Sequence, residues 1–562
     1  MVNLKEPIAV THSLRRILKV LRLERREISA IYFYAILGGL IQLSLPLGIQ
    51  SIISFVLGGS ISTSLVVLII LVVLGVFFNG LVSVNQLRII EKVEQKLFVR
   101  YSFEYTHRIP HLDLRSVDGY YLPEMVNRFF DTVSLQKGIA KLLLDIPTAT
   151  LQILFGLILL SFYHPIFIAF GVVLVLLVWG ILYYSGPRGL ATSIQESDYK
   201  YSVAGWIEEL ARSVWSFKFS RGSKLNLRHT DELVSGYLAS RTSHFRILQL
   251  QYWTLIAFKV LITAAMLIVG SLLLIDQELN LGQFIAAEIV ILLVIGSVEK
   301  LITNLDTIYD VLTSVEKLEK ISDKPLEADG HVPLERSPRG MKVQLDKVRF
   351  GYRSDPVLND IGFNIPPGAT VAVMGPDGSG KSTLMRILSG VYRDHEGSVR
   401  IDDLDLREYK VDDFREQTGI LFNSFEIFRG TLWENITMGH QRMGPREVSA
   451  FAERLGLADW ATGKGPSLSD TIDPLGTRLP SSTVRKILLL RALVNEPRLL
   501  LLEEPFAGLD DPSWDRVRDH LFSLGGMTTV FVETNDEAFA RRCDVVLRFS
   551  KDGLDMKLKN VN

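Results

Sequence analysis

One stretch decides the fold of this sequence: Gly375-Pro376-Asp377-Gly378-Ser379-Gly380-Lys381-Ser382-Thr383. It follows the apolar run Thr370–Met374 and opens the helical pattern Leu384–Leu388. A strand, a glycine-rich loop ending in Lys-Ser and a helix, in this order, are the context in which a phosphate-binding loop forms. The glycines let the backbone wrap an anion closely, and the loop N–H groups and the helix N-terminus point at it. The alternative is a chance glycine turn before a helix, which the complete spacing disfavours.

The side chains of this loop have expected roles toward a bound triphosphate. Lys381 is expected to reach the β- and γ-phosphates, and the hydroxyl of Ser382 is expected to ligate Mg²⁺. The other predicted contacts of the phosphates are Gly375, Asp377, Gly378, Ser379, Gly380 and Thr383. The sequence therefore predicts ATP and Mg²⁺ as cofactors.

Two further sequence features suit ATP binding and hydrolysis. The run Leu499–Leu502 reads as a buried strand, and it ends in Glu503 and Glu504. Such a strand delivers an acid to Mg²⁺, and a second acid can orient the attacking water. Acidic caps at a strand end are the alternative. Tyr352 precedes the loop strand and is expected to stack on adenine, unless it is a simple surface tyrosine.

The composition indicates a membrane protein with a soluble part. Hydrophobic residues make up 48% of the 562 residues, and the mean hydropathy is +0.24. The net charge of −1 gives no reason to expect a nucleic-acid partner. The single cysteine, Cys543, excludes an intramolecular disulfide framework and a cysteine-based metal site.

Six apolar runs predict six membrane-spanning helices, because a span needs about 20 residues. The runs are Ala30–Leu57, Leu65–Val84, Leu142–Phe162, Ile166–Tyr184, Trp253–Ile275 and Phe284–Ser297. The last run is short by itself and extends on either side through weakly polar positions. We therefore expect a transmembrane domain of six helices over residues 28–320.

The charges of the loops orient these spans. The long loops 85–141 and 185–252 carry many lysines and arginines, whereas Gly58–Thr63, Tyr163–Pro165 and Asp276–Leu281 carry none. Because positively charged loops stay on the inner side, both termini and both long loops are predicted to be cytoplasmic. The expected location is the cytoplasmic (inner) membrane, which the chain crosses several times.

An amphipathic segment precedes the first span. Thr11–Ile28 places leucines and isoleucines among basic side chains at helical spacing. It predicts that residues 1–27 lie at the inner membrane surface, with membrane lipids as partners. The alternative is a helix that packs on the protein itself.

The two long loops are expected to continue the spanning helices into the cytoplasm. Each is interrupted at a place suited to a short transverse helix, Gly119–Pro123 and Ser213–Phe219. The aromatic residues at these loop tips favour docking into a soluble domain. Within the spans, Lys259 is expected to reach the inner interface, and Glu288 to face a cavity or the outer headgroups.

A polar stretch with prolines, Ile321–Gly340, marks a domain boundary and predicts a linker over residues 321–340. Beyond it, short β-rich runs alternate with helical stretches. The runs are Val343–Phe350, Thr370–Met374, Ser398–Ile401, Leu499–Leu502, Thr529–Glu533 and Val545–Phe549. This alternation predicts an α/β nucleotide-binding domain over residues 341–562.

Six spans, two cytoplasmic loops and an α/β domain with these motifs in this order resemble an ABC half-transporter of the exporter type. The resemblance implies an all-α transmembrane domain followed by a P-loop nucleotide-binding domain, and a dimer as the working unit. Leu281–Ala286 and Val315–Leu318 look similar to bacterial toxin and bacteriocin exporters of type I secretion. That finer resemblance implies a periplasmic adaptor protein as a further partner.

Aligned with this family, the phosphate loop is kept and other motifs have drifted. The family's Q-loop glutamine falls on Asn423, and its Mg²⁺-binding aspartate falls on Glu503. Its catalytic glutamate is kept as Glu504, and its switch histidine falls on Asn535, which cannot carry an imidazolium charge. The resemblance implies that Asn423 and Asn535 contact the nucleotide. It also implies that Ser382, Glu503 and Asn423 hold Mg²⁺.

The family's signature motif has drifted furthest. It falls on Leu479-Pro480-Ser481-Ser482-Thr483. In the family this loop caps the γ-phosphate bound by the partner subunit, with a serine hydroxyl and backbone N–H groups. Pro480 removes both the hydroxyl and one N–H. Because one lost donor typically costs about 10²–10³ in rate, these changes predict weak ATP hydrolysis.

The leading hypothesis is ATP-dependent export across the cytoplasmic membrane by a dimer, with a peptide or protein as the first guess for the substrate. A lipid or drug-like substrate is the second. The partner is either a second copy of this chain or another half-transporter. A nucleotide-binding, non-pumping or regulatory subunit of a secretion complex is the alternative from a different class. An importer is disfavoured, because spans and ATPase domain are fused in this order.

Overall fold

The computed structural model describes residues 10–59, 63–220, 222–352, 356–440, 442–458, 466–476, 478–550 and 553–558. The chain divides into two compact units. Met1–His111 and Gly119–Lys324 form the helical unit, and Leu112–Asp118 and Pro325–Asn562 form the α/β unit. The short insertion Leu112–Asp118 thus belongs to the α/β unit, although it comes from between two helices of the other.

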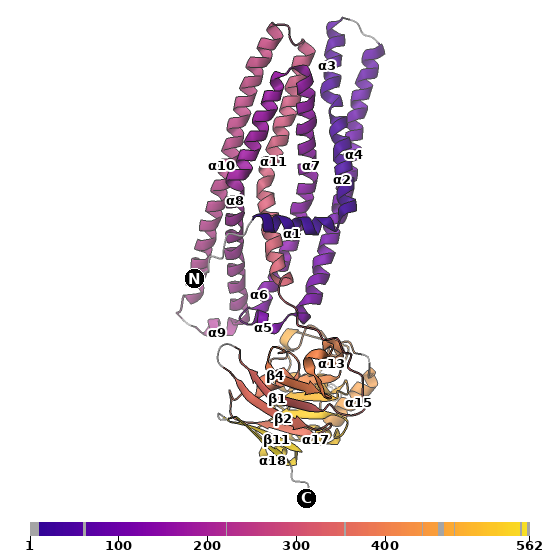
Figure 1. Ribbon diagram of the computed structural model, residues 1–562, viewed down its shortest axis with the longest axis vertical. Coiled ribbons are helices and arrows are strands. Elements are labelled where there is room, and N and C mark those ends of the chain that lie inside the picture. The colour runs from indigo at the N-terminus through magenta and orange to yellow at the C-terminus, as the bar shows by residue number, and fades with distance from the viewer. Residues whose placement is uncertain are drawn as a thin grey trace. The chain divides into compact units, whose positions relative to one another are not determined.

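The helical unit consists of long helices that run side by side (Figure 1). Its helices are α1 (Val10–Arg22), α2 (Arg25–Gln42), α3 (Ser44–Leu57), α4 (Thr63–Arg108), α6 (Leu122–Asn127), α7 (Asp131–Tyr163), α8 (Ile166–Arg212), α9 (Val214–Phe219), α10 (Leu225–Ile275) and α11 (Leu281–Ser322). Within the described part of the chain, six stretches are helical, long and apolar enough to cross a membrane. They contain the six predicted runs, which confirms the six spans. The short sixth run lies in the N-terminal part of the 42-residue helix α11.

The first span is broken into α2 and α3, which a single apolar run did not predict. Pro46 stands in the first turn of α3. Because proline has no N–H, it cannot donate to the carbonyl of Gln42, the last residue of α2. The break between the two helices therefore follows from one residue.

The N-terminal helix α1 lies across the bundle and packs on α11 (Figure 1). The guanidinium of Arg16 pairs with Glu316 at 3.2 Å, and with Glu319 and Asp323 at 2.6 Å each. Ile17, Val20 and Leu21 pack against the apolar core beneath. These contacts support the packing interpretation of the amphipathic segment, whose residues 1–9 lie outside the described chain.

Lys259 finds a partner that the sequence did not name. Its ammonium group pairs with Glu299 of α11, two residues beyond the sixth apolar run. Glu288, the other ionisable residue singled out in the spans, is half-buried on α11. The charge of Lys259 is therefore neutralised within the bundle.

The α/β unit contains a six-stranded sheet in the order β12-β11-β3-β10-β9-β6 and a four-stranded antiparallel sheet in the order β2-β1-β4-β5. The large sheet comprises β3 (Thr370–Met374), β6 (Thr418–Leu421), β9 (Leu499–Glu503), β10 (Thr529–Glu533), β11 (Val545–Ser550) and β12 (Gly553–Leu558). The other consists of β1 (Val343–Phe350), β2 (Leu358–Ile365), β4 (Glu396–Ile401) and β5 (Leu404–Asp405). All strands of the large sheet except β12 are parallel to their neighbours. The predicted α/β class is confirmed.

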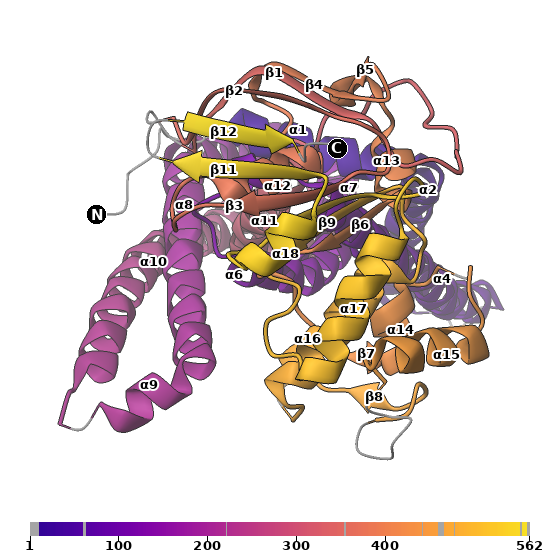
Figure 2. The ribbon, with the colours of Figure 1, turned by 90° about the horizontal axis from the view of Figure 1, so that it is seen from below.

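Helices cover both faces of the large sheet (Figure 2). They are α12 (Lys381–Leu388), α13 (Val411–Glu416), α14 (Leu432–Thr437), α15 (Pro445–Leu455), α16 (Ser481–Leu493), α17 (Asp511–Ser523) and α18 (Glu537–Arg542). A small ribbon pairs β7 (Gly430–Thr431) with β8 (Thr471–Ile472).

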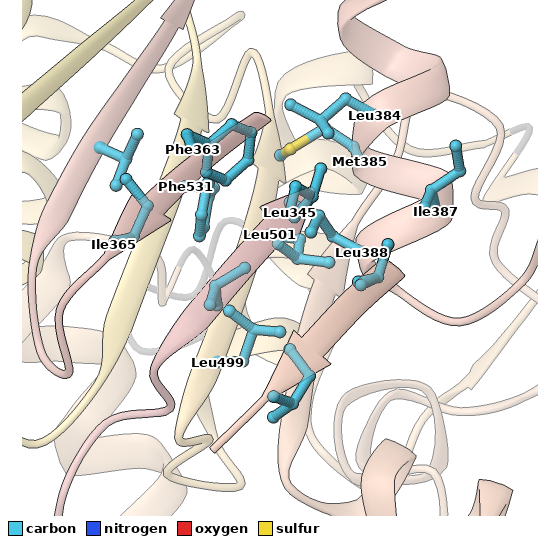
Figure 3. Packing of buried hydrophobic residues seen from close by; sticks show 14 of the residues in the cluster. Leu345, Phe363, Ile365, Leu384, Met385, Ile387, Leu388, Leu499, Leu501 and Phe531 are labelled. Carbon is cyan, nitrogen blue, oxygen red and sulfur yellow. The ribbon is translucent and has the colours of Figure 1, made fainter. Parts of the chain in front are cut away.

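The pleat of the strands divides the core of this unit into two layers. Leu499, Leu501 and Phe531 pack with α12 and the four-stranded sheet (Figure 3). Leu500 and Leu502 pack on the opposite face, with α14 to α18. Because successive side chains of a strand point to opposite faces, even a fully apolar strand contributes to both layers. This alternation also sets the direction of the acids that end the strands.

The stretch 321–340 does not connect the units as an open linker. From Pro325 on it belongs to the α/β unit. The N–H groups of His331 and Val332 donate to the carbonyl of Glu408, at 2.8 and 2.9 Å. Two short helices lie at the first predicted interruption, Gly119–Pro123: α5 (Leu114–Val117), whose N-terminus is capped by Asp113, precedes it, and α6 begins within it. The second predicted transverse helix is present as α9.

Candidate nucleotide site

The candidate site lies at the carboxyl ends of four neighbouring strands. The order β3-β10-β9-β6 brings together the ends of strands that are distant in the sequence. β3 leads into the phosphate loop, β10 ends in Glu533, β9 ends in Glu503, and β6 leads to Asn423. Ligands of open α/β sheets bind at such an edge. The fold therefore assembles the site from pieces that the sequence shows only separately.

The phosphate loop needs its glycines at two positions in particular. Gly375 has a φ of 141°, and a Cβ atom there would lie 2.6 Å from the carbonyl oxygen of Phe549. Gly378 has a φ of 76°, and a Cβ atom there would meet no atom within 4 Å. The first glycine lets the loop pass close to the neighbouring strand, and the second forms an open rim on which a ligand can rest.

Lys381 is 6% exposed and is held by the loop itself. Its Nζ donates to the carbonyl oxygens of Gly375 and Pro376, both at 2.9 Å. It also lies 3.6 Å from Oε1 of Glu533 and 4.0 Å from Oδ1 of Asp377. The ammonium group is thus fixed at the N-terminus of α12, where it adds to the positive potential of the helix.

Ser382 and Glu533 form a contact that the sequence analysis missed. The Ser382 hydroxyl donates to Oε2 of Glu533 at 3.2 Å. Burial raises the pKa of the Glu533 carboxyl, the Lys381 ammonium opposes this, and Glu503 adds to the rise. Glu533 is recognised as part of the site only from the pairing of β9 with β10, which places it beside Glu503.

Glu503 offers a buried oxygen with an unmet bonding capacity. The residue is 1% exposed, and its Oε2 accepts the N–H of Asn423 at 2.9 Å. Its Oε1 has no hydrogen-bond partner among the residues that the structure describes, and the same holds for Oγ of Ser379. Carboxylate and hydroxyl oxygens are the ligands that Mg²⁺ prefers. The buried, unpartnered oxygen of Glu503 therefore fits a hard cation beside Ser382.

Glu504 directly follows Glu503 at the end of β9. It is exposed, and its φ of 45° is unusual for a residue with a side chain. Its N–H donates to the carbonyl oxygen of Glu533 at 3.1 Å, which holds the strained turn in place. Strained backbone of this kind concentrates at functional sites.

Arg485 of α16 connects two of the predicted site residues, although the sequence analysis gave it no role. Its Nη1 donates to Oδ1 of Asn423 at 3.0 Å. Its Nη2 donates to the carbonyl oxygen of Glu504 at 2.7 Å, and also to that of Glu503. The side chain thus ties α16 to the ends of β6 and β9.

Tyr352 is half-buried and anchored to the loop helix. Its hydroxyl lies 3.2 Å from Oγ1 of Thr383 and accepts a hydrogen bond from Arg386 at 3.0 Å. Its ring packs edge-on against Phe350 and Tyr392. The remaining predicted residue, Asn535, is exposed on the loop that follows β10.

The drifted signature segment leads into α16. Pro480 is the N-cap of this helix, and its side chain makes no capping hydrogen bond. Nearby, Asp510 lies 3.6 Å from Nζ of Lys486. The N-terminus of α16 therefore lacks the hydroxyl acceptor that a serine would supply at that position.

Family models match both halves of the chain. The model described as the ABC transporter transmembrane region matches residues 28–298, and the model described as ABC transporter matches residues 358–507. Together they span about three quarters of the chain. The chain belongs to the ABC transporter family. It joins one transmembrane region to one ATP-binding domain, and it is a multi-pass membrane protein.

A solved structure and two curated relatives illustrate this membership. A bacterial Atm1-family ABC exporter with ATP bound has the same fold, with a TM-score of 0.83, 18% identity and 95% of each chain covered. The ATP-dependent lipid A-core flippase of Alkalilimnicola ehrlichii is 28% identical, over 56% of this chain and 53% of its own length. The mycobactin import ATP-binding/permease protein IrtB of Mycolicibacterium smegmatis is 26% identical, over 54% and 53%. The chain thus aligns with about half the length of these relatives.

Proposed function

We propose that this chain is one half of an ATP-driven transporter and that its nucleotide site is the loop Gly375–Thr383. The position of Lys381 carries this proposal. The ammonium group is buried at the N-terminus of α12, next to Ser382 and 3.6 Å from the buried acid Glu533, in a chain whose described residues also hold six spans. A triphosphate needs this combination of backbone N–H groups, one fixed cation and oxygen ligands for its metal. We assign Mg²⁺ to Ser382, Glu503 and Asn423, where it would neutralise phosphate charge.

The working unit is a dimer, either of two copies of this chain or with a second half-transporter. In both cases the predicted orientation places the two termini and the α/β unit in the cytoplasm. A periplasmic adaptor, implied by the likeness to type I secretion exporters, is a further proposal. Co-purification of partners from the native membrane after cross-linking tests both.

The substrate is proposed to be amphipathic. The relatives are named for lipid A-core and for mycobactin, which gives a peptide no preference over other classes. The mycobactin protein is named for import. The fusion of the spans with the ATPase domain therefore does not argue against an importer. An apolar pocket between α8, α10 and α11 favours a substrate with a hydrocarbon part; its lining includes Phe167, Phe170, Met266 and Ile291. A peptide or protein is therefore second.

Hydrolysis is proposed to be slow. Pro480 takes the place of a hydroxyl at the start of α16, and Asn535 takes the place of an imidazole. Several lost donors together predict a turnover at least 10²-fold below that of a chain with the unaltered motifs. The rate of hydrolysis is measured as steady-state ATP turnover of the purified protein, and the Glu504→Gln variant gives the background rate. Fast turnover that depends on Glu504 would refute slow hydrolysis.

Transport itself is tested in inverted vesicles that contain the full chain. We expect ATP-dependent accumulation of a fluorescent phospholipid or of a labelled amphipathic peptide, and its loss in Lys381→Ala. The second candidate function, a nucleotide-binding subunit that does not pump, is favoured by the altered start of α16. It predicts Lys381-dependent ATP binding without accumulation of either probe.

A further inference from the structure

Two buried acids of the α/β unit face the phosphate loop from neighbouring strands. In the parallel ladder, Glu533 of β10 stands directly beside Glu503 of β9. Both continue the alternation in which Leu501 and Phe531 point to the layer that contains α12. Because side chains two residues apart lie on the same face of a strand, the two carboxylates point to the side on which α12 begins.

The contacts of Glu533 agree with this geometry. The residue is 8% exposed, and one carboxylate oxygen accepts from the Ser382 hydroxyl at 3.2 Å. The other lies 3.6 Å from the ammonium group of Lys381. Glu533 thus holds the two side chains that a nucleotide and its metal would use.

A second observation, independent of Glu533, points to a cation at this place. Oε1 of Glu503 is buried and has no hydrogen-bond partner among the described residues. An unpartnered buried carboxylate oxygen carries a large desolvation penalty, which a bound cation would offset. Two carboxylates and one hydroxyl then form an all-oxygen set of ligands.

We propose that Glu533 is a second carboxylate of the Mg²⁺ site and that it makes nucleotide binding strictly dependent on the metal. The inference rests on the proposed nucleotide site. Without Mg²⁺, the negative charge of Glu533 repels the phosphates. It also keeps the side chains of Lys381 and Ser382 in contact with Glu533 and away from the phosphates. With Mg²⁺, the same charge attracts the cation that the phosphates share. Glu533 therefore weakens the binding of free ATP and supports the binding of MgATP.

The experiment measures the affinity of the full chain, purified in detergent, for a fluorescent ATP analogue, once with Mg²⁺ and once with EDTA. In Glu533→Gln, we expect the ratio of the metal-free to the Mg²⁺ dissociation constant to fall at least tenfold, which is about 1.4 kcal/mol. Glu533→Asp keeps the charge and is expected to keep most of the ratio. Mn²⁺ binding in the presence of ATP, followed by electron paramagnetic resonance, is expected to weaken in Glu533→Gln.

The matched control is Glu537→Gln, the same change at an exposed acid that pairs with Arg548 outside the site. It is expected to leave the ratio unchanged. An unchanged ratio in a folded Glu533→Gln protein would overturn the proposal. An equal fall of the dissociation constant with Mg²⁺ and with EDTA would also overturn it, because Glu533 would then only compete with the phosphates. If the wild type binds no MgATP, or binds it without need of Lys381, the proposed nucleotide site itself fails. Thermal unfolding of each variant verifies its fold.

Discussion

Single side chains in the α/β unit decide how the strand ends are held together. Arg485 is the clearest case, because one guanidinium satisfies the amide oxygen of Asn423 and the carbonyl oxygens of Glu503 and Glu504. Burial lowers the pKa of Arg485, and the nearby carboxylates oppose this. The residue therefore supports the site through the amide of Asn423 and the backbone of Glu503 and Glu504.

Arg485→Ala is expected to destabilise the protein by at least about 2 kcal/mol, because a single hydrogen bond to a charged group is worth ~1.5–3 kcal/mol. Thermal unfolding of the purified protein measures the loss as a lower transition temperature. Arg541→Ala, at an exposed position of α18, is the control. Equal transition temperatures for the two variants would contradict this role.

Glu504→Gln is expected to lower ATP turnover by at least 10²-fold while leaving ATP binding intact. The amide keeps the size of the side chain and removes the charge that would orient a water molecule. Turnover and binding are measured on the same preparation. A loss of binding together with turnover would show that Glu504 holds the nucleotide and does not act in hydrolysis.

At the scale of elements, close packing of α7 and α11 holds the helical unit together. Gly138 of α7 faces Val311 of α11, and a Cβ atom at Gly138 would lie 2.2 Å from a Val311 methyl group. Gly156 approaches Val294 in the same way, at 2.7 Å. Small residues let the two helix backbones come close, both at Gly156 in the predicted span, where packing replaces the hydrophobic effect, and at Gly138, which precedes that span.

Gly138→Ala is therefore expected to overpack this contact and to destabilise the protein by about 1–3 kcal/mol. Gly180→Ala in α8 is the matched control, because a Cβ atom there meets nothing within 4 Å. The control should be neutral or slightly stabilising, since alanine favours a helix over glycine. Thermal unfolding in detergent compares the two; a Gly138→Ala protein as stable as the control would contradict the packing argument.

At the scale of the whole molecule, the chain passes from the helical unit into the α/β unit and back at Leu112–Asp118. Arg115 of α5 pairs with Asp394 and lies 5.7 Å from the centre of the Phe350 ring. The N–H of Asp113 donates to the carbonyl oxygen of Pro325 at 3.1 Å. A segment between two long helices is thereby fastened to the ATP-binding unit, which suits it to transmit movement.

Arg115→Asp is expected to reduce transport at least tenfold, with a smaller effect on basal ATP turnover, because the ion pair with Asp394 becomes a repulsion. The double variant Arg115→Asp with Asp394→Arg is expected to recover transport. Arg446→Ala, an exposed arginine of α15, is the control. Parallel losses of transport and turnover, without recovery in the double variant, would contradict a coupling role.

What the sequence determined by itself is local. The loop Gly375–Thr383 and the apolar runs could be recognised because a glycine turn, a helix start and a membrane span each depend on residues that are close in the chain. The run Leu499–Leu502 was found for the same reason. The short strand β6 and the polar strand β12 were missed, because their stability comes from their neighbours in the sheet.

Only the tertiary structure decided which distant residues meet. Glu533 becomes part of the candidate site because β10 lies between β3 and β9, and Arg485 joins it because α16 packs beside β6. The membership of Leu112–Asp118 in the α/β unit was hidden for the same reason. Strand order and helix docking are set by the burial of whole faces against one another, and no stretch of local sequence carries that information.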